Sequence, residues 1–147
     1  MASTEGIAAN SSIEKVNWKI GEGFNNTILM AVSGATSAAK VAVLLYAGNS
    51  TAGQWFIPSM NELNELCKYA RGQTTGDLTV ACTSGGTLKT TLYAGSDLGG
   101  FVGDIYLSSS EYDATRSLGR YFSIANLTIN GGKRSPYLLY VRPVRAF

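Results

Sequence analysis

The chain has 147 residues, of which 45% are hydrophobic and 15% are charged, and its formal net charge is +2. This length predicts one domain with a proper core, and the composition excludes a disordered chain and a dedicated nucleic-acid binder. Histidine is absent, which removes Ser-His-Asp and Cys-His catalysis and histidine metal sites. We therefore expect no enzyme, no cofactor and no metal site. The longest apolar run, 41–47, is too short for membrane insertion.

The first third of the chain predicts a lead-in and three elements. Residues 1–15 are polar and predict a flexible lead-in to a single domain over 16–147. Alternating Val16, Trp18 and Ile20 predict a short strand over 16–20. Residues 27–32 fit a second strand or an extended lead-in, and alanines with aliphatic residues predict a buried helix over 37–46.

The clearest element is a helix over 59–70. Ser59 and Glu62 have the spacing of a capping box, Pro58 precedes them, and Gly72 is placed to end the helix. One face is apolar at helical spacing: Met60, Leu63, Leu66, Cys67 and Ala70. The opposite face, expected to be a solvated stripe, carries Glu62, Glu65, Lys68 and Arg71.

The second half is rich in glycine turns and short strand-like segments. Strands are predicted at 78–82, 105–107, 121–124 and 137–144. Asn130-Gly131-Gly132 is a hairpin-turn signal, and Pro143 favours an edge or terminal position in the last strand. Two helices followed by strands predict an α+β domain with a twisted, mostly antiparallel sheet and long loops.

Two cysteines, Cys67 and Cys82, lie fifteen residues apart. They fit a disulfide or two buried thiols, and a redox or copper pair is the less favoured alternative. Ser37 and Lys40 match the S-x-x-K pattern of penicillin-recognising enzymes, but the supporting motifs are absent, so a helix start is the better interpretation.

Acidic residues gather in the loop-rich half: Asp97, Asp104, Glu111 and Asp113. Calcium takes six to eight oxygen ligands, but this spacing matches no EF-hand loop. Ordinary surface or ion-paired carboxylates are therefore favoured over a calcium site.

Arginines and tyrosines alternate toward the C-terminus, a combination typical of recognition surfaces. We expect this segment to bind a glycan, sulfated or neutral, or a protein epitope. The predicted ligand-binding residues are Tyr112, Asp113, Arg116, Arg120, Lys133, Arg134 and Tyr137. The alternative is a β-sheet with outward arginines and half-buried tyrosines.

Two segments resemble a known family. Residues 55–63, WFIPSMNEL, are similar to W-x-x-P-[ST]-x-x-E-L, and residues 106–111, YLSSSE, are similar to Y-W-S-S-[ST]-E with Leu107 in place of tryptophan. Further matches, in order, are Asn26-Thr27, Ala38-Ala39, Tyr121-Phe122, Lys133 and residues 140–147, YVRPVRAF. Over 17–147 the chain resembles the domain family of the C-terminal domain of the Legionella collagen-like adhesin. Ser117-Leu118-Gly119 stands where that family often has Ala-Trp.

The resemblance implies a C-type-lectin-like fold, distantly similar to phage tropism determinants and formylglycine-generating enzymes. The enzymatic branch needs a cysteine pair that Cys67, on a helix, does not match. The matching residues are expected to serve the fold: Trp55, Pro58, Ser59, Glu62, Glu111, Arg142 and Arg145. A buried Glu111 would need a partner, for which Arg142 and Arg145 are the candidates.

The expected function is a non-enzymatic recognition module that binds a glycan or surface receptor, as part of an adhesin or phage appendage. The alternative is a structural or decoration protein of a virion without its own ligand. We expect an extracellular, cell-surface or virion location, although the chain shows no signal peptide. Weak single sites favour a homo-oligomer, with a trimer attached to a larger fibre or particle as the expected form and 18–24 as the contact.

Overall fold

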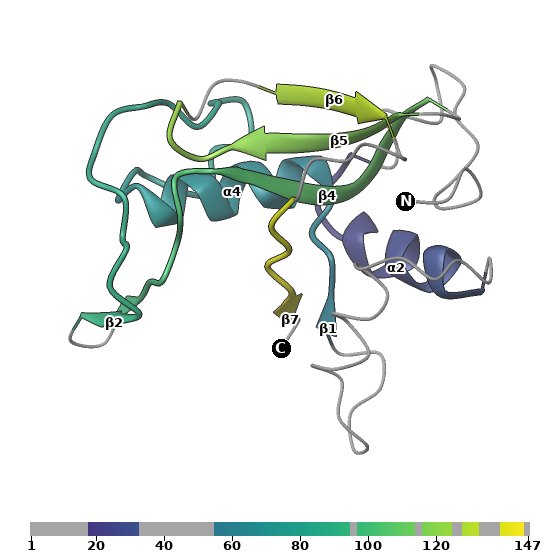
Figure 1. Cartoon of the computed structure of the whole chain (residues 1–147), viewed down its shortest axis with the longest axis horizontal. Helices are drawn as coiled ribbons and strands as arrows, with labels where there is room; N and C mark the ends of the chain where they lie inside the picture. The colour runs from purple at the N-terminus through teal and green to yellow at the C-terminus, as the bar shows by residue number, and fades with distance from the viewer. Residues whose placement is uncertain are drawn as a thin grey trace.

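The computed structural model describes residues 18–32, 55–94, 97–113, 116–124, 128–132 and 139–145. The predicted lead-in and the predicted helix with Ser37 and Lys40 lie outside these ranges. The described part is an α+β fold with two helices, α2 (Glu22–Val32) and α4 (Met60–Ala70) (Figure 1). The strands are β1 (Trp55–Phe56), β2 (Tyr93–Ala94), β3 (Asp97–Leu98), β4 (Ile105–Asp113), β5 (Arg116–Tyr121), β6 (Thr128–Gly132) and β7 (Val144–Arg145). They form three small antiparallel sheets, β1–β7, β2–β3 and β4–β5–β6.

The region before β1 differs from the prediction. Residues 18–21 form turns, so the strand expected over 16–20 is wrong in its described part, 18–20. Residues 22–32 form α2, so both alternatives expected for 27–32, a strand and an extended lead-in, are wrong. Tertiary contacts hold the turn, because Ser59 Oγ donates to Lys19 O at 2.7 Å and Gly21 N donates to Glu62 Oε1 at 2.8 Å. The first turn of α2 packs closely against the Glu62 side chain, because a Cβ at Gly23 would lie 2.1 Å from Glu62 Oε2.

The predicted helix over 59–70 is confirmed as α4. Both halves of the capping box are present: Glu62 N donates to Ser59 Oγ at 3.4 Å, and Ser59 N donates to Glu62 Oε2 at 2.7 Å. Gly72 follows the helix with a φ of 66°, a conformation that favours glycine. Leu63, Cys67 and Ala70 are buried against Phe101, Tyr106 and Phe122 from the sheet side, and together these form the main core.

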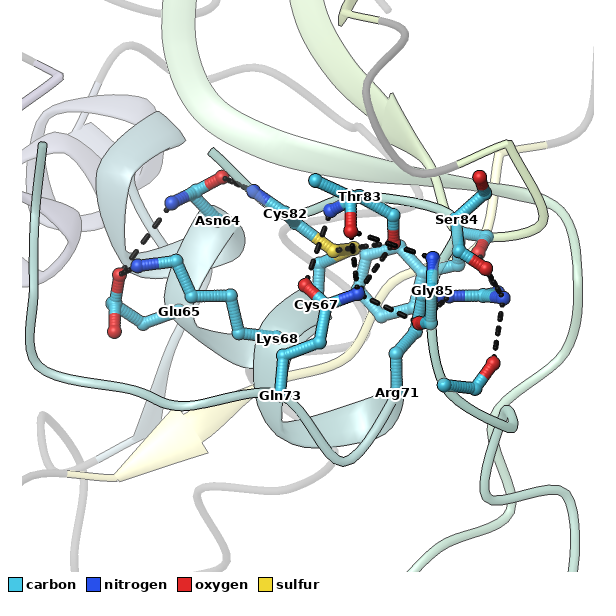
Figure 2. The surroundings of a disulfide bond; sticks show 12 residues. Asn64, Glu65, Cys67, Lys68, Arg71, Gln73, Cys82, Thr83, Ser84 and Gly85 are labelled. Atoms are coloured by element: carbon cyan, nitrogen blue, oxygen red, sulfur yellow. Dashed lines mark hydrogen bonds and ion pairs between the residues drawn. A yellow bond between two sulfur atoms is a disulfide. The ribbon is translucent and has the colours of Figure 1, made fainter. Parts of the chain in front are cut away.

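The expected solvated stripe on α4 is wrong at two residues. Lys68 is 1% exposed and Arg71 is 8% exposed, because the loop over 73–88 lies on this side of the helix (Figure 2). Residues 78–82 belong to this loop and form no strand. Helical periodicity identifies a polar face, but it does not show whether water or a loop covers that face.

Side chains of α4 hold the loop through its backbone (Figure 2). Lys68 Nζ donates to Glu65 Oε1 at 2.5 Å and to Asp77 O at 2.6 Å. Arg71 donates to four carbonyl oxygens, those of Ser84, Gly85, Gly86 and Phe122. Asn64 accepts from Cys82 N at 2.8 Å and donates to Val80 O at 3.1 Å. A loop without regular structure thus has its buried polar groups satisfied by the helix.

Cys67 and Cys82 form a disulfide, with their Cα atoms 5.9 Å apart. The structure therefore decides between the alternatives that the sequence leaves open. Both residues are fully buried in the main core, so the bond joins α4 to the loop from the apolar side.

The three-stranded sheet packs over α4. The predicted strand at 105–107 is confirmed and extends to Asp113. The strand expected at 121–124 is wrong, because β5 ends at Tyr121 and residues 122–124 form a turn. The hairpin turn expected at Asn130-Gly131-Gly132 is wrong: these residues belong to β6 and pair with Leu118, Ser117 and Arg116 of β5. Glycine occurs within strands as well as in turns, and here Gly131 and Gly132 lie in β6, at the edge of the described three-stranded sheet.

The described segment 139–145 contacts both β4 and β1. Tyr140 N donates to Ile105 O at 2.8 Å and Leu107 N donates to Tyr140 O at 2.9 Å, which sets this segment beside β4. Of the strand predicted over 137–144, the described residues 139–143 form only an isolated bridge at Tyr140. Strand β7 begins at Val144 and pairs with β1 through Phe56↔Val144 and Trp55↔Arg145. Pro143 directly precedes β7 and lies outside the strand, so its expected place within the last strand is wrong.

Candidate ligand-binding cleft

A cleft of about 520 Å³ opens between the arm that carries β2 and β3 and the β1–β7 pair, with α4 behind it. Figure 1 shows that the arm and the β1–β7 pair both extend away from α4 in the same direction. Its described lining residues are Trp55, Leu66, Tyr69, Leu92, Leu98, Phe101, Arg142, Pro143, Val144 and Arg145. The volume lies within the range of about 300–1,000 Å³ that is typical of small-ligand sites.

Aromatic rings fix the shape of the cleft. The Tyr69 hydroxyl donates to Leu98 O and accepts from Leu98 N, both at 3.0 Å, and so anchors the arm to α4. Its ring packs edge-on against Phe101, with centroids 6.3 Å apart, and Lys89 Nζ lies 4.1 Å from the ring centroid. Trp55 forms part of the opposite wall and is half-buried. These contacts give the cleft preformed walls.

The arm itself presents apolar side chains to the cleft and to solvent. Leu92 is 55% exposed and Leu98 is 51% exposed, although both line the cleft. Large aliphatic side chains at the rim of an aromatic cleft are typical of ligand-binding surfaces.

Both charged residues in the described lining are arginines. Arg142 is half-buried, its guanidinium carbon lies 4.9 Å from the Phe101 ring centroid, and one amino group donates to Gly99 O at 3.0 Å. Arg145 is exposed and lies opposite Trp55 in the β1–β7 register. No aspartate or glutamate belongs to the described lining.

A second, shallower hollow of about 550 Å³ adjoins the cleft and shares Leu66, Tyr69 and Val144 with it. It differs in charge, because its lining includes Glu62 and Glu65. Ile20, from the segment expected to make the subunit contact, lies in its wall and is 46% exposed.

The predicted ligand-binding residues that the structure describes lie elsewhere, on the three-stranded sheet. The structure brings Tyr112 and Arg116 together, with the guanidinium carbon 4.2 Å from the ring centroid, and pairs Asp113 with Arg116 across β4 and β5. Lys133, Arg134 and Tyr137 lie outside the described residues, and the side chain of Asp113 is also not described.

Arg120 does not fit the predicted ligand site. It is 7% exposed in β5, and burial lowers the pKa of its guanidinium. A buried side chain within the sheet is not accessible to an external ligand, so this assignment is wrong. Alternation along a strand places neighbouring residues on opposite faces, and the sequence alone does not show which face is covered.

The residues expected to serve the fold divide into two groups. Pro58 and Ser59 are buried, and Glu62 completes the cap, as predicted. Trp55, Arg142 and Arg145 instead line the cleft, so their role is not confined to the fold. In the sequence, Arg142 and Arg145 stand out because they flank Pro143-Val144 in an otherwise apolar segment. The sequence does not show that they lie near Trp55, because this depends on how β1 pairs with β7.

Glu111 is buried, at 4% exposed, as predicted. Its expected pairing with Arg142 is wrong, because Arg142 contacts Gly99 O and the Phe101 ring. Pairing with Arg145 stays a prediction. The Glu111 carbonyl accepts from Trp18 Nε1 at 3.3 Å, which ties the turn before α2 to β4.

Among the described residues, no group of three or more cysteine, aspartate or glutamate side chains could hold a metal ion. No helix in the described part of the chain is long and apolar enough to cross a membrane. Comparison with protein-family models, with curated proteins and with solved structures finds no significant match to this chain.

Proposed function

We propose that this protein is a non-enzymatic recognition module that binds a cell-surface glycan in the cleft between the β2–β3 arm and the β1–β7 pair. The observation that carries the proposal is the combination of Trp55, Tyr69 and Phe101 with two arginines around one cavity of about 520 Å³. The family resemblance points to the same class of function.

The lining suits a sugar. A pyranose ring has an apolar C–H face that packs on aromatic rings, and its hydroxyls accept hydrogen bonds from guanidinium groups. The described lining offers apolar side chains for packing and guanidinium groups that donate hydrogen bonds. It includes no carboxylate or thiol that could serve as nucleophile or general base. This composition supports binding rather than catalysis.

The proposed setting is an adhesin or phage appendage outside the cell. A buried disulfide is typical of oxidising environments, and it supports this setting. A homo-oligomer, with a trimer as the preferred form, would raise the avidity of single weak sites. Ile20 and Phe24 are exposed apolar residues in the segment proposed for that contact.

A structural or decoration protein of a virion is the second candidate. It is favoured by exposed apolar side chains that a neighbouring protein could cover, including Leu78, Val80 and Ile124. Such a protein would need no ligand in the cleft, and this separates the two candidates.

The proposal is tested by binding of the full chain to a glycan array. Wild-type protein should bind a defined set of glycans, and Trp55→Ala should abolish that binding while circular dichroism shows an intact fold. The matched control is Tyr112→Ala, which removes an aromatic ring from the three-stranded sheet and should leave the binding unchanged.

Two results would contradict the proposal. Absence of any glycan binding by the wild type would favour the second candidate. Loss of binding in Tyr112→Ala with retention in Trp55→Ala would move the site to the sheet.

A further inference from the structure

The arm brings a hydrogen-bond donor next to two leucines in the wall of the cleft. Gly99 directly follows Leu98 in the chain, and its N–H donates to Leu92 O at 2.8 Å. Arg142 donates from one amino group to Gly99 O at 3.0 Å. One guanidinium and two aliphatic residues therefore meet around a single backbone position of the arm, and all three line the cleft.

The two leucines present apolar surface that the fold leaves open. Leu92 and Leu98 are each more than half exposed, although they lie in the wall of a cavity of about 520 Å³. Covering such side chains with an apolar group removes hydrocarbon surface from water and is favourable. A ligand that places a small apolar substituent at this point gains affinity from it.

The Arg142 side chain is positioned before a ligand binds. Its guanidinium carbon lies 4.9 Å from the Phe101 ring centroid, and within the described part of the chain its one hydrogen bond goes to Gly99 O. A guanidinium has five N–H donors in a planar fork, so donors remain for a neutral acceptor such as a carbonyl oxygen. A side chain held in place loses less entropy when it binds a ligand.

Tyr69 contributes its ring to the cleft rather than its hydroxyl. The hydroxyl donates to Leu98 O and accepts from Leu98 N, both at 3.0 Å, so its only proton is already used within the fold. The donor beside the leucines is therefore the guanidinium of Arg142 and not the phenol of Tyr69.

An acetamido group matches this arrangement of a donor and two leucines. It has a carbonyl oxygen, which accepts a hydrogen bond, and a methyl group bonded to the same carbon atom. The oxygen can accept from Arg142 while the methyl group packs on Leu92 and Leu98. A hydroxyl group in its place would leave the leucines in contact with water.

We propose that the cleft binds an N-acetylated hexosamine, with the acetamido carbonyl at Arg142 and the acetamido methyl group on Leu92 and Leu98. The sugar ring then packs on the aromatic walls. This inference rests on the proposed function and names the class of sugar that the same cleft takes.

The test measures affinities of methyl glycosides for the full chain by NMR titration. The probes are the glycosides of N-acetylglucosamine and N-acetylgalactosamine, their N-formyl counterparts, glucose and galactose. At least one N-acetylated probe should bind about tenfold or more tightly than the sugar with a hydroxyl in place of the acetamido group, because the methyl contact and the carbonyl acceptor are both lost. The N-formyl counterpart keeps the carbonyl and should bind up to about fourfold less tightly, the effect of one buried methyl group.

Variants locate the acetamido group in the cleft. Leu92→Ser and Leu98→Ser should each reduce the difference between the N-acetyl and N-formyl probes. Arg142→Met removes the donor and should weaken both acylated probes toward the affinity of the hydroxyl probe. The matched control is Leu78→Ser, which removes an equally exposed leucine outside the cleft wall and should change neither difference. The leucine variants alter exposed side chains and are expected to fold even if Arg142→Met does not.

The outcomes separate the inference from the proposed function. Equal affinity for acylated and hydroxyl probes, lost in Trp55→Ala, would overturn the acetamido inference and leave the glycan site standing. Equal affinity for N-acetyl and N-formyl probes would also overturn it, because the methyl contact would be absent. Failure of the wild type to bind any probe would overturn it too, while the array still decides the proposed function. An N-acetyl preference that survives in both leucine variants would overturn the placement on the arm.

Discussion

Helix α4 has two very different neighbours. Toward the 73–88 loop it presents Asn64, Lys68 and Arg71, each bonded to loop backbone groups. Toward the cleft it presents Leu66 and Tyr69, beside an arm whose leucines are half exposed. The loop side is held mainly by polar side chains of the helix, whereas the cleft side has mainly apolar walls and is joined to the arm by the Tyr69 hydroxyl.

The difference shows how one helix can serve both stability and recognition. Buried polar groups must be satisfied, so the polar side of α4 fixes a single loop conformation. Apolar surface is not directional, so the cleft side can receive a ligand without breaking hydrogen bonds of the fold. We therefore expect substitutions on the loop side to change stability and substitutions on the cleft side to change binding.

The largest expected effect is on the loop side. Lys68→Ala should lower the free energy of unfolding by about 3–5 kcal/mol, because Glu65 and the Asp77 carbonyl lose a buried cationic donor. Urea denaturation measures this. The double variant Lys68→Met/Glu65→Gln should recover part of the loss, since no charge is then left without its partner. A loss below about 1 kcal/mol in Lys68→Ala would contradict the importance of this contact.

The disulfide is expected to contribute slightly less. Cys67→Ala/Cys82→Ala should cost about 3 kcal/mol, the value expected for a closed segment of this length. Amide hydrogen exchange should show the loss of protection concentrated in residues 73–88, with Tyr69 and Leu98 less affected. Uniform loss of protection on both sides of α4 would contradict the claim that the disulfide stabilises the loop side more than the cleft side.

The cap at the start of α4 comes next. Ser59→Ala should cost about 1–2 kcal/mol, because Glu62 N loses its acceptor and Lys19 O loses its donor. Ser59→Thr, which keeps a hydroxyl, is the matched variant and should cost less. An unchanged denaturation midpoint in Ser59→Ala would count against the cap as a stabilising contact.

The core beneath the cleft should respond to alkaline pH. Burial raises the pKa of Tyr106, whose ring contacts Phe101 and Phe122 and whose hydroxyl accepts from Val102 N. The unfolded chain therefore loses this proton at a lower pH than the folded chain does. The stabilisation is fully present below the ordinary tyrosine pKa of about 10 and decreases as the pH rises above it.

Tyr106→Phe separates this effect from other alkaline transitions. The variant should show a weaker fall in stability above pH 10 than the wild type, measured by thermal denaturation from pH 8 to 11. Identical pH profiles in the two proteins would show that Tyr106 does not carry the effect.

The smallest effect on stability is expected at the cleft rim. Leu92→Ser should change the free energy of unfolding by no more than about 0.5 kcal/mol, because the side chain is largely exposed. The same substitution should weaken glycan binding by removing part of the apolar wall. Leu78→Ser, equally exposed but away from the cleft wall, should leave binding unchanged.

Local patterns in the sequence predict α4 well, because the capping box, the apolar spacing and Gly72 all act within a few residues. They do not predict whether a polar residue is buried by another segment of the chain. Lys68 and Arg71 have the spacing of solvated residues, yet a loop lies over them. They also fail at α2, where contacts of Ser59 and Glu62 with residues 18–21 hold the turn before the helix.

The cleft could not be predicted because its walls come from segments that are far apart in the chain. Trp55, Tyr69, Leu98 and Arg142 meet only after β1 pairs with β7 and the arm docks on the Tyr69 hydroxyl. The sequence placed recognition at Tyr112 and Arg116, which do come together, but on the three-stranded sheet and outside the described cleft wall. Arginine–tyrosine composition indicates the chemistry of recognition without locating it.

The most direct test of the cleft uses the indole N–H signals of Trp18 and Trp55 in a nitrogen–proton NMR spectrum of the full chain. Trp55 lines the cleft, whereas Trp18 Nε1 donates to Glu111 O in β4. A Trp18→Phe variant assigns the two signals. Titration with a glycan that binds on the array should shift the Trp55 signal and leave the Trp18 signal in place. A shift of Trp18 alone, or of neither signal at saturating glycan, would contradict the assignment of recognition to the cleft.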